Sequence, residues 1–114
     1  MTRSIDLRLN DGVLQFMNES GQWQNVDADN PNTGVNEGDE IDWNGDASID
    51  KIKIKPPTGA ILAKVTGNDS KNPKGSIKSG LSGNLTQKYT ISVKSVDQKG
   101  GYIDFDPKIT FPLE

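Results

Sequence analysis

The chain of 114 residues contains no cysteine and no histidine. The lack of cysteine excludes disulfide bonds and thiolate catalysis, and without either residue type a zinc finger has no ligands. The lack of histidine excludes serine–histidine–aspartate triads, histidine-ligated haem and acid–base catalysis by imidazole. Long hydrophobic runs are also missing, because the longest uninterrupted apolar segment covers only residues 60–63. We therefore expect no segment that spans a membrane.

Charge and length narrow the possibilities further. The 13 basic and 16 acidic side chains give a net charge of −3, whereas nucleic-acid-binding proteins usually carry a basic excess. We therefore expect no nucleic-acid partner. The length predicts a single domain over residues 1–114, large enough to fold without a metal or a disulfide. Residues 1–10 carry no hydrophobic signal, which predicts a cytoplasmic protein or the mature form of an exported one.

The residues that are abundant favour an all-β fold. Glycine, proline, asparagine, aspartate and serine account for 49 of the 114 residues, and each of these types favours turns. Isoleucine and valine contribute 16 residues, against 13 for alanine, leucine and methionine combined. β-Branched side chains pack well on a pleated sheet. Residues 5–9, 50–55 and 89–93 alternate apolar and polar side chains, which is typical of strands with one buried face.

Short apolar runs recur along the chain with turn residues between them. This spacing predicts a β-sandwich or a β-barrel of about 7–9 strands. The apolar side chains that share a phase are expected to form one core between two sheets. They are Ile41, Trp43, Ile52, Ile54, Tyr89, Ile91, Ile103 and Ile109.

Several connections are expected from turn chemistry. Asn10-Asp11-Gly12 is expected to turn the chain into the next strand. Asn44-Gly45 is a two-residue hairpin signal, because both residues tolerate positive φ angles. Val96 is out of phase with the strand before it, which predicts a bulge near Lys94-Ser95. Residues 67–84 are polar with few large apolar members, and we expect them to form one long loop.

Three short segments carry a family resemblance: Gly-Asp-Glu-Ile-Asp-Trp at 38–43, Tyr-Thr-Ile-Ser-Val at 89–93 and Asp-Pro-Lys-Ile at 106–109. They resemble parts of the cupredoxin-like domains, the plastocyanin and azurin group. Residues 38–43 resemble the glycine–aspartate turn and tryptophan-bearing core strand of that family. Residues 89–93 are similar to its late strand, which ends at the copper-binding cysteine, and residues 106–109 are similar to its closing strand. The resemblance covers roughly residues 36–112 and implies a Greek-key β-sandwich with an aromatic side chain between its sheets. An immunoglobulin-like sandwich is the main alternative, because its strand and turn pattern fits nearly as well.

The chain departs from that family at the copper site. A blue-copper centre needs two imidazoles and a thiolate with a weak axial thioether, and this chain has neither histidine nor cysteine. Its two methionines, Met1 and Met17, lie outside the matching region. The resemblance therefore implies a copper-free domain that holds no cofactor and acts through its surface.

Charge is distributed unevenly along the sequence. Residues 1–50 hold 11 acidic and 2 basic side chains, whereas residues 51–114 hold 5 acidic and 11 basic ones. Lys51, Lys53 and Lys55 alternate with isoleucines, so they form a candidate interaction surface for a protein partner. Two simpler interpretations compete with this one. The lysines can protect an exposed strand edge, and the two halves of the chain can neutralise each other across neighbouring strands.

Trp23 and an acidic loop are the remaining candidates. Trp23 lies between two glutamines and is the more exposed tryptophan by pattern, which makes it a candidate contact for a sugar ring. The loop at 27–38 and the adjoining Asp39 are rich in aspartate and asparagine, whose oxygens are ligands for calcium. The spacing of an EF-hand loop is absent there, so a solvated acidic loop is the simpler interpretation. Asp104 and Asp106 share one strand face and are the carboxylates that a hydrolase would need.

These observations favour a non-enzymatic module over an enzyme, because histidine, the usual general base, is absent. The first hypothesis is a metal-free protein-interaction or structural module, monomeric or weakly self-associating. The alternative is a carbohydrate- or calcium-binding module.

Overall fold

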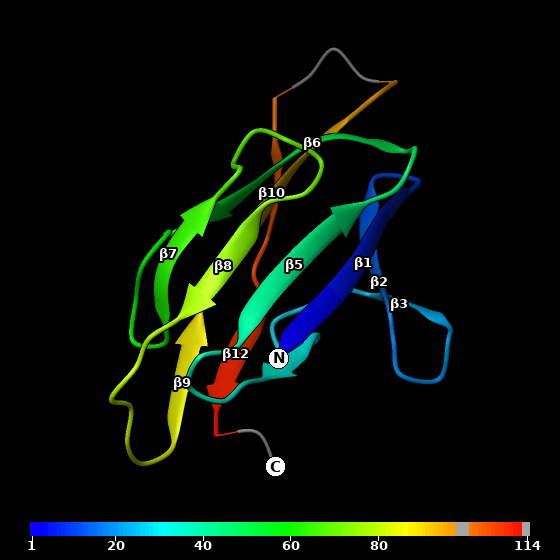
Figure 1. The fold of residues 1–114 in the computed structure, drawn as a ribbon. Coiled ribbons are helices and arrows are strands. Elements are labelled where there is room, and N and C mark those ends of the chain that lie inside the picture. The colour runs from blue at the N-terminus through cyan, green and yellow to red at the C-terminus, as the bar shows by residue number, and fades with distance from the viewer. Residues whose placement is uncertain (98–100, 113–114) are drawn as a thin grey trace.

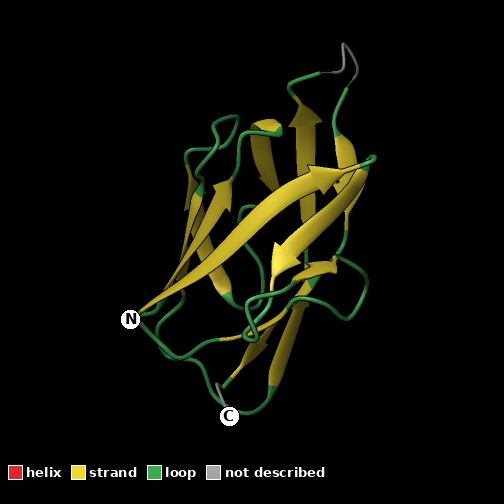
Figure 2. Ribbon diagram, turned by 90° about the vertical axis from the view of Figure 1, so that its right-hand side faces the viewer, coloured by secondary structure: helices red, strands yellow, loops and turns green. Residues whose placement is uncertain are grey.

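The structure, a computed structural model, describes residues 1–97 and 101–112. These residues form strands and loops without a helix (Figure 2), which confirms the predicted all-β class. The strands are β1 (Thr2–Asn10), β2 (Val13–Met17), β3 (Trp23–Asn25), β4 (Asn32–Gly34), β5 (Glu40–Gly45), β6 (Ile49–Lys55), β7 (Leu62–Thr66), β8 (Lys74–Ile77), β9 (Leu85–Lys88), β10 (Thr90–Ser95), β11 (Ile103–Phe105) and β12 (Lys108–Phe111).

One layer of the sandwich is a six-stranded sheet in the order β3-β2-β1-β5-β8-β7 (Figure 1). Strands β1 and β5 run parallel over six residue pairs, from Thr2 opposite Glu40 to Leu7 opposite Gly45. The other adjacent pairs in this sheet are antiparallel. The sheet is therefore mixed.

The other layer consists of two three-stranded sheets, β11-β10-β6 and β4-β12-β9. They are joined along the chain, because β9 leads into β10 and β11 leads into β12 with only short breaks. At one break the Tyr89 backbone N–H donates to the Pro107 carbonyl (3.1 Å), which holds the two chain segments together. These breaks, with the short strands β4 and β8, explain why the described residues contain 12 strands and not the predicted 7–9.

The two layers enclose one apolar core. It combines side chains of the six-stranded sheet with side chains of the two smaller sheets, so the predicted meeting of two sheets is confirmed. Seven of the eight side chains predicted for the core are buried in it, and the eighth, Ile103 of the edge strand β11, is partly buried and packs against it. The fully or nearly fully buried hydrophobic residues are Ile5, Leu7, Leu14, Phe16, Val26, Val35, Ile41, Trp43, Ile49, Ile52, Ile54, Ile61, Leu62, Ile77, Tyr89, Ile91, Val93 and Ile109.

Trp43 and Tyr89 pair at the centre of this core. Their ring centroids lie 5.8 Å apart with planes tilted by 58°, within the range that aromatic pairs prefer. The indole N–H of Trp43 donates to the Tyr89 hydroxyl (3.2 Å), so the buried donor has a partner. Burial raises the pKa of Tyr89, and the hydroxyl remains protonated. The Greek-key connectivity and the cupredoxin-like or immunoglobulin-like assignment stay predictions.

Two of the predicted connections are confirmed and one is wrong. Asp11 and Gly12 have φ angles of 51° and 78° and join β1 to β2 as a two-residue hairpin. The pairing of β10 with β6 shifts register between Lys94 and Ser95, which is the predicted bulge. Asn44-Gly45, in contrast, forms no hairpin: both residues belong to β5, and the chain turns after them to enter the other layer.

The prediction of one long loop at 67–84 is also wrong, because this segment contains strand β8. Its first part covers the free edge of β6. The Ile52 backbone N–H donates to the Ser70 carbonyl (2.7 Å), and the Asn68 side chain accepts from the Ile54 N–H (2.9 Å). Asn68 also donates to the Ile54 carbonyl (3.3 Å), so an amide side chain replaces a neighbouring strand. An edge covered in this way offers few free groups to another chain.

Candidate functional site

The three predicted lysines of β6 lie at the edge of the β11-β10-β6 sheet, as the edge-protection interpretation requires. They alternate with Ile52 and Ile54, which are fully buried, so the lysines belong to the outer face. The register places Lys51 directly opposite Lys94 of β10 and Lys53 opposite Ser92. We call Lys51, Lys53, Lys55 and Lys94 the lysine face.

Two carboxylates of the same outer face, Asp104 and Asp106, are engaged within the sheet. Asp104 accepts a hydrogen bond from the Ser92 hydroxyl (2.5 Å) and lies 3.8 Å from the Lys55 ammonium. Asp106 accepts from the Thr90 hydroxyl (2.6 Å). Each aspartate therefore has its own hydroxyl partner on β10. This arrangement assigns both carboxylates to cross-strand contacts.

Lys51, Lys53 and Lys94 form no ion pair among the described residues. Like charges directly opposite each other destabilise a sheet pair, so the Lys51–Lys94 contact costs folding stability. Sequence patterns identified the three lysines of β6 but missed Lys94. Lys94 lies more than forty positions further along the chain, and only the strand register brings it beside Lys51.

The two halves of the chain are partly interleaved. Lys74 pairs with Asp42 (3.9 Å) and Lys108 with Asp29 (3.5 Å), and each pair joins a lysine of the second half to an aspartate of the first. The predicted neutralisation between the halves therefore occurs at these two places. The lysine face is separate from both pairs.

Trp23 is part of a network on the outer face of the six-stranded sheet. The Arg8 guanidinium lies 4.5 Å from the centre of the Trp23 ring, a distance typical of cation–π contacts. Arg8 also donates to Gln15 (2.8 Å), and Gln15 donates to Asn25 (2.8 Å). Trp23 is half-buried, and the guanidinium takes up space at its ring. These contacts give Trp23 a structural role and do not favour the sugar-binding hypothesis.

The acidic side chains of the loop at 27–38 are dispersed. Asp27 accepts hydrogen bonds from the Asp29 backbone N–H (2.8 Å) and from the Asn30 side chain (3.3 Å), which shapes a local turn. Asp29 pairs with Lys108. Within residues 1–97 and 101–112, no group of three acidic side chains is close enough to hold a metal ion.

Asp39, the last acidic residue of this region, is buried at 6 % exposure. Burial acts to raise its pKa, but other contacts outweigh this effect and hold the pKa below the ordinary value of 3.8. These contacts are the Asn36 backbone N–H (2.8 Å), the Met1 amino group (3.4 Å) and the Arg3 guanidinium (3.6 Å). The carboxylate therefore anchors the start of β1 beside the turn that precedes β5.

Replacing Asp39 with asparagine should make the stability of the protein less dependent on pH. A carboxylate whose pKa is lowered by folding stabilises the native state above its unfolded pKa of about 4, and this contribution disappears as the pH falls through its folded pKa. We expect Asp39→Asn to cost about 1–2 kcal/mol near neutral pH and much less near pH 2. Urea unfolding at both pH values measures this, with the exposed Glu40→Gln as the control. An equal loss at both pH values would contradict the prediction.

Comparison of the sequence with protein-family models and with curated proteins gives no match. Within the part of the chain that the structure describes, no helix is long and apolar enough to cross a membrane. The surface of the domain itself is therefore the source of evidence for its function.

Proposed function

We propose that this protein is a non-enzymatic interaction module that recognises an acidic surface of a partner protein through its lysine face. The observation that carries the proposal is the direct opposition of Lys51 and Lys94. Folding alone favours a carboxylate at one of these two positions, because opposite charges stabilise a cross-strand pair. A surface that keeps two lysines together at a cost in stability is suited to a negatively charged partner.

The neighbouring side chains support the same interpretation. Asp104 and Asp106 accept hydrogen bonds from the Ser92 and Thr90 hydroxyls, and Asp104 pairs with Lys55. The ammonium groups of Lys51 and Lys53 are thus left for a partner. The edge of β6 is covered by residues 68–70, so recognition at this face would use side chains and not strand addition.

Charge reversal of Lys51 and Lys94 tests the proposal. Binding of a fluorescent ten-residue polyglutamate peptide, which represents an acidic protein surface, is measured by anisotropy at low ionic strength. We expect Lys51→Glu/Lys94→Glu to weaken binding at least about fivefold, because exposed charges act mainly through long-range attraction. Lys64→Glu/Lys78→Glu, at exposed positions in β7 and just after β8 in the other layer, is the control with the same change in net charge.

Two results would count against the lysine face. One is equal weakening by Lys64→Glu/Lys78→Glu, which would show that only net charge matters. The other is unchanged peptide binding in the double variant. The melting temperature of the double variant serves as the folding control and should change little, because a glutamate pair with the same like-charge repulsion replaces the lysine pair.

A further inference from the structure

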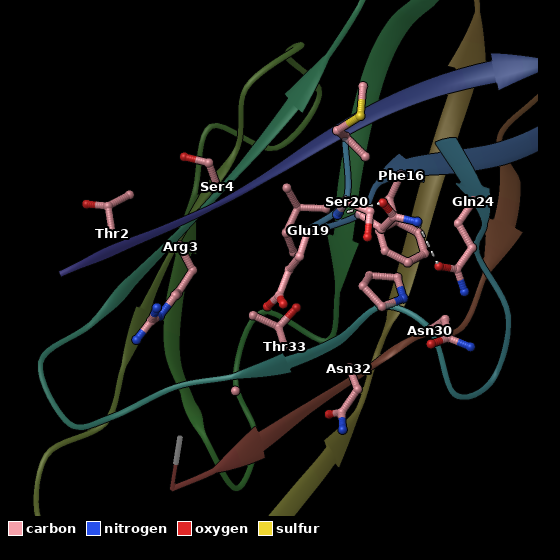
Figure 3. A pocket seen from close by; sticks show the side chains of 15 residues that line it. Thr2, Arg3, Ser4, Phe16, Glu19, Ser20, Gln24, Asn30, Asn32 and Thr33 are labelled. Atoms are coloured by element: carbon pink, nitrogen blue, oxygen red, sulfur yellow. Dashed lines mark hydrogen bonds between the residues drawn. The ribbon is translucent and has the colours of Figure 1, made fainter. Parts of the chain in front are cut away.

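A groove of about 650 Å³ lies between the first half of β1 and strand β4 (Figure 3). The half-buried Met17 and the small exposed parts of Ile5, Phe16 and Pro31 provide its apolar surface. Its remaining lining is mainly hydroxyl and amide side chains. The volume is typical of protein pockets that bind a ligand. The lysine face contributes no residue to this groove, so the two surfaces are distinct.

The β1 wall of the groove is an unpaired strand edge. Strand β2 pairs with β1 only from Leu7 onward, whereas β5 pairs with its other side from Thr2. The ladder with β5 uses the odd-numbered residues, since the Glu40 N–H donates to the Met1 carbonyl and the Asp46 N–H donates to the Leu7 carbonyl (both 3.0 Å). The N–H and C=O groups of Thr2 and Ser4 therefore point to the opposite side. No strand of the described chain pairs with them there.

Strand β4 presents a second unpaired edge. It pairs with β12 through alternate residues, because the Lys108 N–H donates to the Pro31 carbonyl (3.3 Å) and the Val35 N–H donates to the Thr110 carbonyl (3.0 Å). The backbone groups of Asn32 and Gly34 accordingly point away from β12. Both residues line the groove.

We propose that this groove binds an extended segment of a partner protein by strand addition. Each wall offers backbone donors and acceptors two residues apart, a spacing of about 6.6 Å in a strand. An extended polypeptide repeats its own donors and acceptors at the same interval, and main-chain hydrogen bonds then provide the affinity. The contrast with β6 supports the proposal: residues 68–70 cover that edge, whereas Thr2 and Ser4 remain open beside an apolar floor.

The side chains of the groove define the chemistry of the segment. Glu19 is its one carboxylate, and Figure 3 shows the side chain reaching toward Thr33 of the other wall. The Arg3 guanidinium, also in the lining, is paired with Asp39, and Glu19 forms no ion pair among the described residues. The segment should therefore alternate apolar and polar residues, with apolar side chains on Phe16 and a lysine or arginine beside Glu19.

A panel of synthetic eight-residue peptides tests this proposal. Valine alternates with threonine in each, and one polar position carries lysine, serine or glutamate. Binding is followed by NMR at about 150 mM salt, where exposed charges are screened beyond about 8 Å. We expect the lysine peptide to bind best and to shift the amide signals of Thr2, Ser4, Asn32 and Gly34. N-methylation at alternate backbone positions should weaken binding at least about tenfold, because it removes the donors of a strand.

Variants of the groove separate backbone from side-chain recognition. Ser4→Pro removes the N–H that points into the groove, at an edge position where proline is tolerated. This variant should bind the lysine peptide at least about tenfold more weakly. Ser4→Ala keeps that N–H and should change binding less than about twofold. Glu19→Lys alters only an exposed side chain and should reverse the preference toward the glutamate peptide.

Three results would overturn strand addition by a partner. If the peptide shifted only the amide signals of the lysine face, it would bind there and not in the groove. Tight binding of the N-methylated peptide would exclude main-chain pairing. Peptide-free dimerisation that Ser4→Pro abolishes would identify a second copy of this chain as the occupant. Lys51→Glu/Lys94→Glu should leave peptide binding in the groove within about twofold, so failure at one surface is distinguishable from failure at the other.

Discussion

Replacing Gln87 with methionine is expected to lower the free energy of unfolding by about 3 kcal/mol, since each buried donor left unsatisfied costs about 1–3 kcal/mol. Gln87 is 6 % exposed in β9, and its side-chain carbonyl accepts hydrogen bonds from the Ile61 and Leu62 backbone N–H groups (both 2.8 Å). These two residues lie at the start of β7 in the other layer. One amide side chain thus joins the β4-β12-β9 sheet to the edge of the six-stranded sheet.

Methionine suits this test because it has nearly the same length and shape but offers only a weak acceptor. The side-chain nitrogen of Gln87 has no hydrogen-bond partner among the described residues, so the substitution removes little besides the two accepted bonds. We expect the melting temperature to fall by about 10–20 °C. Thr86→Ala, at the exposed neighbouring position, is the control and should cost less than about 1 kcal/mol. Similar losses in both variants would show that the hydrogen bonds of Gln87 contribute little.

The local glycine supports this role for Gln87. A Cβ atom at Gly59 would lie 2.4 Å from the Gln87 side chain, closer than atoms can approach. The backbone therefore passes over the amide at a distance that only glycine permits. No sequence pattern identifies this pair, because a glutamine in an alternating strand is expected on the solvent side. The contact appears only when β9 and the segment before β7 are brought together.

Sequence periodicity identified the strands that have one buried face. Residues 5–9 and 50–55 alternate clearly, and both segments lie in strands, β1 and β6. Strand β8 was not predicted, because Lys74 and Gly75 give its sequence little apolar character. In the structure Gly75 nevertheless packs directly against Trp43. The hairpin prediction at Asn44-Gly45 failed for a related reason. A glycine that tolerates a turn is also accepted in a strand where neighbouring side chains leave no room for a larger residue. A Cβ at Gly45 would lie 3.2 Å from Ile49 and Ile52.

The candidate surfaces were predictable to different degrees. Lys51, Lys53 and Lys55 share a face because strand side chains alternate, and a sequence pattern shows this directly. Lys94 and the groove depend on which strands are neighbours. An unpaired edge such as that of Thr2 and Ser4 has no sequence signature, because it is defined by the absence of a partner strand. Register and strand order are the information that local patterns do not contain.

The packing of Gly75 against Trp43 predicts strong coupling between these two positions. A Cβ at Gly75 would lie 2.9 Å from Cη2 and 3.0 Å from Cζ3 of the Trp43 ring, and 3.0 Å from a methyl group of Leu62. Gly75→Ala should therefore destabilise the protein by about 1–3 kcal/mol through overpacking. Trp43→Phe leaves a cavity and breaks the hydrogen bond to Tyr89, with an expected loss of about 2–4 kcal/mol.

The double variant should cost less than the sum of the two single variants by about 1 kcal/mol or more, since residues in contact couple by about 0.5–3 kcal/mol. Phenylalanine lacks the outer ring atoms that the new methyl group would meet. In the double variant the methyl group of Ala therefore fits without overpacking and fills part of the cavity that the smaller ring leaves. Urea unfolding of the wild type and the three variants measures this coupling. The control is the same cycle with Gly80→Ala in place of Gly75→Ala. A Cβ added at Gly80 would meet nothing within 4 Å, although the φ of 75° is strained for alanine. Strain at Gly80 should add to the loss from Trp43→Phe without coupling. Additive losses for Gly75 and Trp43 would mean that the sheet moves apart at β8 to accept the methyl group.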